Sequence, residues 1–185
     1  ACINFVPPAL SVLGALLANE WGIIGGGMHI AMHAFGKITL FFAAGAVMVA
    51  AHEKKISRMH GLGRTMPITF GAFFVGSLSI IGLPPAGGSW SKWFLAMGTL
   101  EAGQVGLLMV LMLSSLLGLY YLLEVPVKAF FFKPLEDAHH REGIHEAPTA
   151  SLIAIIITAI MTVGLFVRPD LAFNLMAMVI PGGVQ

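Results

Sequence analysis

The sequence predicts an all-α membrane protein, a polytopic bundle of about five transmembrane helices that form a single membrane domain over residues 1–185. Of the 185 residues, 57% are hydrophobic and 10% are charged, whereas soluble domains carry about 25% charged residues. The mean hydropathy is +0.89. Because so few polar groups cannot cover a water-facing surface, we expect lipid to cover most of the chain.

The expected spans follow from the roughly 20 apolar residues that one helix needs to cross a bilayer. The first covers about residues 3–19, where Pro7 and Pro8 make the helix start irregular. The second runs from Trp21 to Ala51, and the others are expected at 66–100, 104–127 and 149–167. We expect the short apolar tail that begins at Leu171 to lie along the membrane surface.

Basic residues gather in two loops, between the second and third spans and between the fourth and fifth. Since basic loops stay in the cytoplasm, the first span is predicted to run outward and the C-terminus to lie outside. The alternation holds only if the long stretch 66–100 crosses the membrane once.

That stretch would be about 52 Å long as one straight helix, so it must be interrupted. The break is predicted between Gly82 and Ser91, in a segment whose hinge residues are Gly82, Pro84, Pro85, Gly87 and Gly88. Broken helices mark ion and substrate sites in transporters. The alternative is a tight hairpin between two short helices.

Three ionisable residues repeat every fourth position in the second span, namely His29, His33 and Lys37. This spacing places them on one face of a helix, with Lys37 close to the bilayer midplane. A charged lysine there costs at least about 2.5–3.5 kcal/mol, which favours a functional role in proton exchange. Histidines on the same face can extend such a relay, although either histidine alone is also compatible with packing.

Lys92, just past the break, is the fourth candidate for the relay, and Ser91 beside it is a further one. The alternative for Lys92 is that its amine extends to the outer headgroups. Glu124 is expected near the cytoplasmic headgroups, with proton uptake as the alternative.

Several functions are not supported. The net charge of +1 argues against nucleic acid as a partner. A zinc site on His29 and His33 lacks the glutamate that the metalloprotease motif requires, and Cys2 is the single cysteine. We expect no metal and no cofactor, because no nucleotide, flavin or iron–sulfur motif is present.

Four runs of sequence resemble the proton-translocating membrane subunits shared by respiratory complex I and multisubunit cation/proton antiporters. They are Gly25–Lys37 with the following Leu40–Ala46, then His60–Pro67, Ile81–Lys92 and the segment that starts at Glu146-Ala147-Pro148. Within the family the chain is most similar to the D-type subunit of the sodium(potassium)/proton antiporter. The chain departs from the usual pattern at Met32, where the family has Asn, and at Ser89, where it has Phe.

The resemblance implies about fourteen helices in the complete family member, of which this chain is the C-terminal third. It implies that Lys37 belongs to a central charged axis with His29 and His33 beside it, and that Lys92 is the outward terminal carrier. The implied partners are other membrane subunits of a hetero-oligomeric complex, the lipid bilayer, H⁺ and either Na⁺ or K⁺, in a prokaryotic plasma membrane.

Three functions stay open at this point. The chain is expected to serve a monovalent cation/proton antiporter, with the proton-pumping membrane arm of an NADH-quinone oxidoreductase or membrane hydrogenase as the alternative. A structural membrane fragment without transport of its own is the third. The chain itself carries no redox group, so any electron transfer must reside in a partner.

Overall fold

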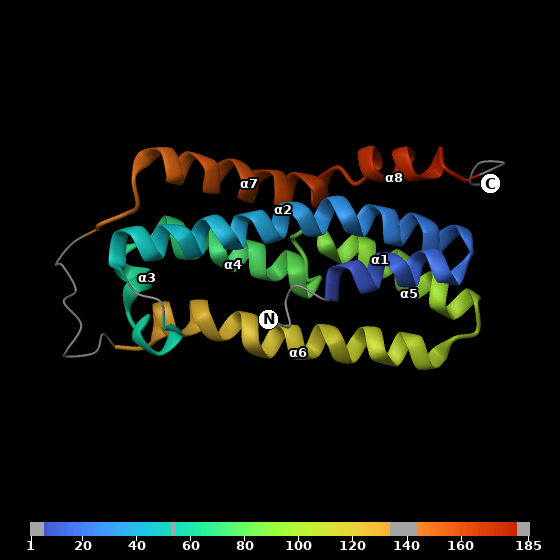
Figure 1. Cartoon of the computed structure of the whole chain (residues 1–185), viewed down its shortest axis with the longest axis horizontal. Coiled ribbons are helices and arrows are strands. Elements are labelled where there is room, and N and C mark those ends of the chain that lie inside the picture. The colour runs from blue at the N-terminus through green and yellow to red at the C-terminus, as the bar shows by residue number, and fades with distance from the viewer. Residues whose placement is uncertain (1–5, 53–54, 134–143, 181–185) are drawn as a thin grey trace.

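A computed structural model describes residues 6–52, 55–133 and 144–180, and within these ranges every regular element is a helix. The helices lie side by side along one axis in an elongated bundle (Figure 1). In chain order they are α1 (Val6–Leu17), α2 (Glu20–Ala51), the 3₁₀ turn η2 (Ile56–Arg58), α3 (Leu62–Thr65), α4 (Pro67–Ile81), α5 (Gly88–Glu101), α6 (Val105–Phe131), α7 (Thr149–Val167) and α8 (Asp170–Ala177). The predicted all-α membrane bundle is confirmed.

Three of these helices, α2, α6 and α7, are long and apolar enough to cross a membrane. They occupy the stretches expected to span at 21–51, 104–127 and 149–167, and α6 continues four residues beyond the expected end, to Phe131. α1 has 12 residues and begins at Val6, and the start of that expected span, residues 3–5, lies outside the described residues. The side of the membrane that each end faces stays a prediction.

α2 is the central helix, since it contacts α1, α4, α5, α7 and α8. Small residues permit this crowding, because a backbone without a side chain lets a second helix approach closely. A Cβ added to Gly36 would lie 3.0 Å from the side chain of Ser79 in α4, and one added to Gly26 would lie 3.1 Å from the Cα of Gly14 in α1. The face of α2 that carries the histidines is therefore enclosed by other helices.

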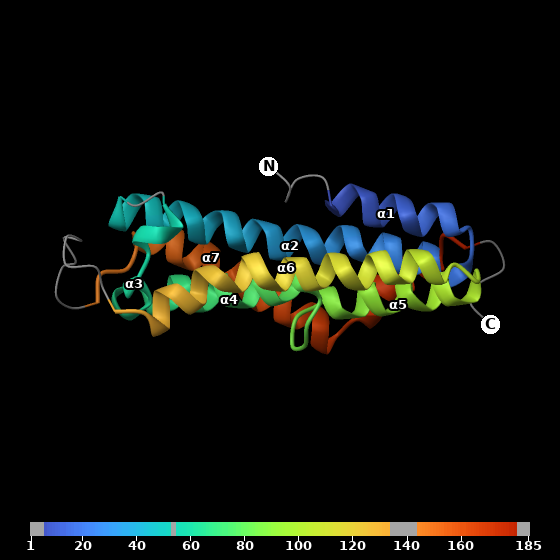
Figure 2. The same cartoon turned by 90° about the horizontal axis from the view of Figure 1, so that it is seen from below.

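The stretch 66–100 is a broken helix rather than a hairpin. α4 and α5 follow one another along the bundle, each beside a different half of α2 (Figures 1 and 2). The hairpin alternative is wrong, and the single crossing required by the basic loops is supported. The break is also shorter than expected: it covers residues 82–87, because α5 already begins at Gly88 and includes Ser91.

Gly82 ends α4 in the left-handed conformation, with φ of +87°. The amides of Gly82 and Leu83 both donate to the carbonyl of Leu78, at 2.9 Å each, which is the usual way to close the last turn of a helix. The Pro84–Pro85 bond that follows is cis. This closure satisfies Leu78 but leaves the later carbonyls of α4 to other donors.

α8 lies against the first half of α2 rather than across the end of the bundle (Figure 1). Ala172 of α8 is buried with Ile24 and Met28 of α2, and the ring of Phe173 lies 5.5 Å from that of Phe94 in α5. The tail expected along the membrane surface is thus packed along the bundle, because its apolar side finds an apolar partner on α2.

The carboxylate of Glu146, in the segment before α7, caps the N-terminus of α4. Its Oε1 accepts from the amide of Ile68 at 2.6 Å, and its Oε2 accepts from the hydroxyl of Thr69 at 2.7 Å. The amide of the preceding His145 donates to the carbonyl of Thr65. A negative group at a helix N-terminus satisfies free amides and complements the helix dipole, so this contact fixes one end of α4.

Replacing Glu146 by Ala should loosen the first turn of α4, since the Ile68 amide then loses its acceptor. A lost N-cap costs about 0.5–2 kcal/mol, which corresponds to amide exchange faster by roughly a factor of 2 to 30. Hydrogen–deuterium exchange of the peptide that contains Ile68 and Thr69 measures this. Glu101→Ala, at the exposed end of α5, is the control, and equal exchange in both variants would contradict the capping role.

Candidate functional site

The expected stripe on α2 exists, and its two histidines face the inside of the bundle. His29 and His33 are 2% and 9% exposed, and their ring centroids lie 5.3 Å apart, as residues one helical turn apart should. The imidazole of His33 is also close enough to Lys37 and Lys92 to interact with both electrostatically.

Lys37 lies one turn beyond the histidines and faces a different environment. Its side chain is half-buried, and its Nζ lies 5.8 Å from the centroid of the Phe41 ring, a cation–π contact. Phe41 is 60% exposed. Lys37 therefore sits at the margin of the bundle, beside an exposed ring.

The Lys92 ammonium is directed inward, to the broken end of α4. Its Nζ donates to the carbonyls of Ile80 at 3.1 Å and Ile81 at 2.7 Å, and to the hydroxyl of Ser115 in α6 at 2.8 Å. These three acceptors match the three N–H groups of an ammonium. The alternative in which Lys92 extends to the headgroups is wrong, because the free carbonyls of α4 offer it better partners.

The two prolines of the break explain why those carbonyls are free. In a continued helix the carbonyls of Ile80 and Ile81 would accept from the amides of residues 84 and 85. Both positions are proline, which has no N–H. The Lys92 ammonium supplies the donors that the prolines lack. The segment 84–92 therefore contains both the prolines that leave the two carbonyls without amide donors and the lysine that bonds to them.

His29 and Ser91 form the second polar contact at the break. The hydroxyl of Ser91 donates to the carbonyl of Gly88 at 3.0 Å and lies 3.1 Å from Nδ1 of His29. When the hydroxyl proton is directed to Gly88, Nδ1 of His29 carries the imidazole proton and donates to Ser91, whereas in the other tautomer Ser91 donates to Nδ1. Nε2 of His29 is buried and has no hydrogen-bond partner among the described residues.

A cavity joins these groups. It is lined by residues of α1, α2, α4, α5 and α6, namely Leu10, His29, His33, Ile80, Lys92, Ser114, Ser115, Gly118 and Tyr121. It offers about 20 Å³ to the centre of a water molecule, which is enough for one water. The structure thus brings together His29, His33 and Lys92, with Ser91 at hydrogen-bond distance from His29, while Lys37 does not line the cavity.

Sequence reasoning missed the contribution of α6. Ser114, Ser115, Gly118 and Tyr121 line the cavity, but the stretch reads as uniformly apolar. The available signal was the spacing of three or four residues from the two serines to Gly118 and from Gly118 to Tyr121, which places small and polar groups on one side of the helix.

Glu124, nearer the end of α6, is outside the cavity and pairs with Lys128 at 2.5 Å, with both side chains partly exposed.

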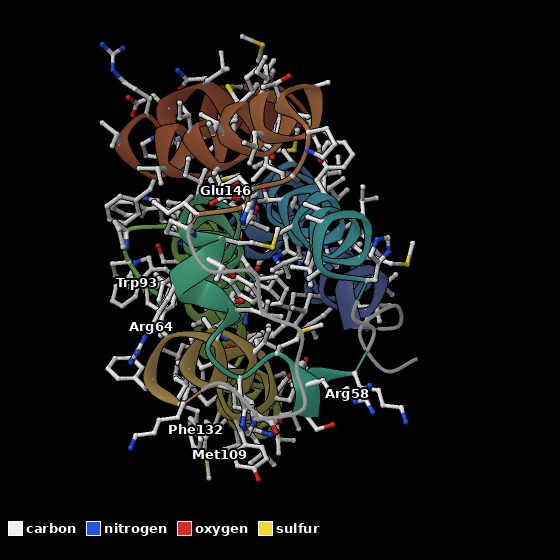
Figure 3. All side chains as sticks on the ribbon, turned by 90° about the vertical axis from the view of Figure 1, so that its left-hand side faces the viewer. Arg58, Arg64, Trp93, Met109, Phe132 and Glu146 are labelled. Atoms are coloured by element: carbon white, nitrogen blue, oxygen red, sulfur yellow. The ribbon has the colours of Figure 1, made fainter. Side chains whose placement is uncertain are left out.

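Two backbone carbonyls of α7 accept hydrogen bonds from the broken segment and from the start of α5. The amide of Gly87 donates to the carbonyl of Thr162 at 3.1 Å, and the indole of Trp90 donates to the carbonyl of Phe166 at 3.0 Å. Trp93, three residues on, is 61% exposed and lies at the edge of the bundle (Figure 3). The hinge residues and the start of α5 are therefore fixed by α7 as well as by Lys92.

Among the described residues, no group of three or more His, Cys, Asp or Glu side chains is placed to hold a metal ion. The ionisable residues at the cavity are histidines, a tyrosine and a lysine. Such groups bind and release protons, and hydroxyl and carbonyl oxygens surround them. Such an arrangement is suited to the exchange of protons.

Comparison with known proteins identifies a family. Residues 9–118 match the family described as "NADH:quinone oxidoreductase/Mrp antiporter, TM". The chain is 35% identical over 167 residues to NADH-quinone oxidoreductase subunit N of Desulforudis audaxviator (strain MP104C), an alignment that covers 84% of this chain and 33% of that protein. The chain spans between about a fifth and a third of the length of the curated relatives it matches.

Two solved structures share the fold. The Mrp complex from Dietzia sp. DQ12-45-1b matches with a TM-score of 0.79 at 23% identity, over 90% of this chain and 38% of that chain. The membrane-bound sulfane sulfur reductase (MBS), an archaeal respiratory membrane complex, matches with a TM-score of 0.74 at 27% identity, over 89% and 27%. The matched complexes therefore include both an Mrp complex and a respiratory complex.

The left-handed Gly82 gives a direct test of the site's geometry. In Gly82→Ala the new methyl group would sit in a disfavoured conformation and meet the stem of Lys92 at Cδ, which should cost about 1–3 kcal/mol and displace the amine. The melting temperature of the membrane complex that contains the chain measures the loss. Gly71→Ala in α4, where a Cβ meets nothing within 4 Å, should be neutral or stabilising; equal melting temperatures would contradict the tight fit.

Proposed function

The chain belongs to the NADH:quinone oxidoreductase/Mrp antiporter transmembrane family, and from that premise we propose that it passes protons across a membrane within a multisubunit monovalent cation/proton antiporter. The observation that carries the proposal is the shared cavity of His29, His33 and Lys92 beside a broken helix. Buried ionisable groups are costly in a membrane, and there they mark ion pathways.

The proposed path runs along α2 and ends at the break. A proton on Lys37 passes to His33, one helical turn away, and from there toward His29, whose ring lies 5.3 Å off. Nε2 of His29 accepts the proton, and a water in the cavity connects the histidines to the Lys92 amine. Lys92 is the terminal carrier on the far side, as its position on α5 past the break suggests.

The position of Lys37 supports the involvement of a partner. Its neighbours on the same side of α2, Ile38 and Phe41, are 41% and 60% exposed, so a further protein segment can cover this face. We propose that the segment belongs to the same longer protein or to another membrane subunit of the complex, and that it delivers protons to Lys37. The proposal places the complex in a prokaryotic plasma membrane with the C-terminus of the chain outside.

A second candidate function is a proton pump driven by electron transfer. The observation that favours it is the 35% identity to a subunit of NADH-quinone oxidoreductase. The same residues would then move protons, while redox groups in partner subunits would supply the energy. In either case the chain's own residues bind and release protons, and a role as the D-type subunit of an antiporter remains the finer proposal.

Lys37→Ala and Lys92→Ala should each abolish transport, since each removes one station of the path. In inverted vesicles that contain the complete complex, Na⁺ or K⁺ added to a preformed proton gradient should dequench acridine orange in the wild type and in neither variant. Lys55→Ala, in the loop after α2, is the matched control, because it removes a lysine that is exposed.

The outcomes separate the proposals. Full dequenching in both variants, with verified expression, would refute the proton path. A cation response absent even from the wild type, with a proton gradient formed on adding NADH or another reductant and lost in the variants, would refute antiport and support the redox-driven pump.

A further inference from the structure

The place that the Lys92 ammonium occupies is built entirely from oxygen atoms. Two are backbone carbonyls, of Ile80 and Ile81, and the third is the Ser115 hydroxyl, at distances of 2.7 to 3.1 Å from Nζ. The residues that line the adjoining cavity include no carboxylate. Within the part of the chain that the structure describes, the groups that hold this positive charge are therefore dipoles.

The orientation of the Ser115 hydroxyl makes it a ligand for a cation. It donates its proton to the carbonyl of Leu111, one turn earlier in α6, at 3.1 Å. The lone pairs of its oxygen are thereby turned toward Lys92. Because the Ser115 hydroxyl uses its proton within α6, its oxygen acts as an acceptor toward any positive group at the position of the Lys92 ammonium. That group can be an ammonium or a metal ion.

The end of α4 adds a favourable field. The carbonyls of Ile80 and Ile81 belong to the C-terminus of a helix of 15 residues, where the helix dipole places about half a negative charge. Carbonyl oxygens at a break within the membrane replace the hydration shell of monovalent cations in channels and transporters. The donor set around Lys92 is therefore of the kind that binds Na⁺ or K⁺.

We propose that Ile80, Ile81 and Ser115 form a binding site for a monovalent cation, which the Lys92 amine and the transported ion occupy in turn. The inference rests on the proposed antiport function for its use, and it names where the exchanged ion binds. When the lysine side chain turns into the adjoining cavity, which has room for one group of that size, the three oxygens become free to bind the incoming ion. Both occupants need the same oxygens, so they exclude one another.

The size of the site favours K⁺, because an ammonium group and a potassium ion have similar radii, and the oxygens already stand at ammonium distances. Lys92→Ala empties the site, so the purified complete complex carrying this variant should bind K⁺ saturably in a choline buffer, at least about tenfold more tightly than the wild type does. Isothermal titration calorimetry measures the affinity. Lys92→Met keeps most of the side-chain length without the charge, so it still fills much of the space and should bind no better than the wild type.

A second substitution on the Lys92→Ala background identifies the ligand. Ser115→Ala should weaken K⁺ binding about tenfold, because it removes one of the three oxygens. Ser77→Ala is the matched control, since the Ser77 hydroxyl is buried in α4 but bonds to the carbonyl of Phe73 in its own helix. Co-purification of the partner subunits reports assembly, and Lys92→Ser, which also vacates the site, replaces Lys92→Ala if that variant does not assemble.

The proposal is overturned if the vacated variant that assembles binds K⁺ no better than the wild type and Lys92→Met, or if Ser115→Ala leaves its affinity unchanged. Binding is measured without a gradient, so it does not depend on transport. K⁺ binding in the vacated variant with no cation response in wild-type vesicles would refute antiport alone. A wild-type cation response with no K⁺ binding in the vacated variant would refute this site alone.

Discussion

The structure depends on how a broken helix inside a membrane satisfies its own carbonyls. Lipid offers no donors, so a chain that stops being helical there must find them in the protein. At the end of α4, Gly82 and Leu83 satisfy Leu78, and the Lys92 ammonium satisfies Ile80 and Ile81. The charge of Lys92 is tolerated in turn because those carbonyls and Ser115 use all three of its N–H groups. The break and the buried lysine each make the other possible.

The position of α2 follows from the same constraint. Its histidines reach the break because glycines and small side chains let α1, α4 and α5 lie close to it. The contact between His29 and Ser91 then brings the polar face of α2 to the start of α5. α7 closes the opposite side by accepting from Gly87 and Trp90. A site of a few polar atoms is thus held by six helices, α1, α2, α4, α5, α6 and α7, whose remaining surface is largely apolar.

Sequence reasoning located most of the elements but few of the contacts. The spans, the break and the stripe of His29, His33 and Lys37 depend on local composition and helical period, which one stretch of sequence contains. The partners of Lys92 join residues 11, 12 and 23 positions away, and the cap on α4 joins residues 77 and 78 positions apart. Such pairs depend on tertiary packing, so neither the Ser115 contact nor the inward direction of Lys92 was available from pattern alone. The packing of the tail on α2 was not available for the same reason, since an apolar face reads alike whether lipid or α2 covers it.

The two ends of α4 have one consequence for how the site can be reached from a distance. A carboxylate, Glu146, holds its first turn, and an ammonium, Lys92, holds its last. Between them lies a single rod of about 22 Å, at 1.5 Å per residue, which is stiff along its axis. A displacement of Glu146 along the axis of α4 would therefore also displace the carbonyls at the other end of this helix. A single helix thus connects the segment before α7 to the ionisable groups at the break.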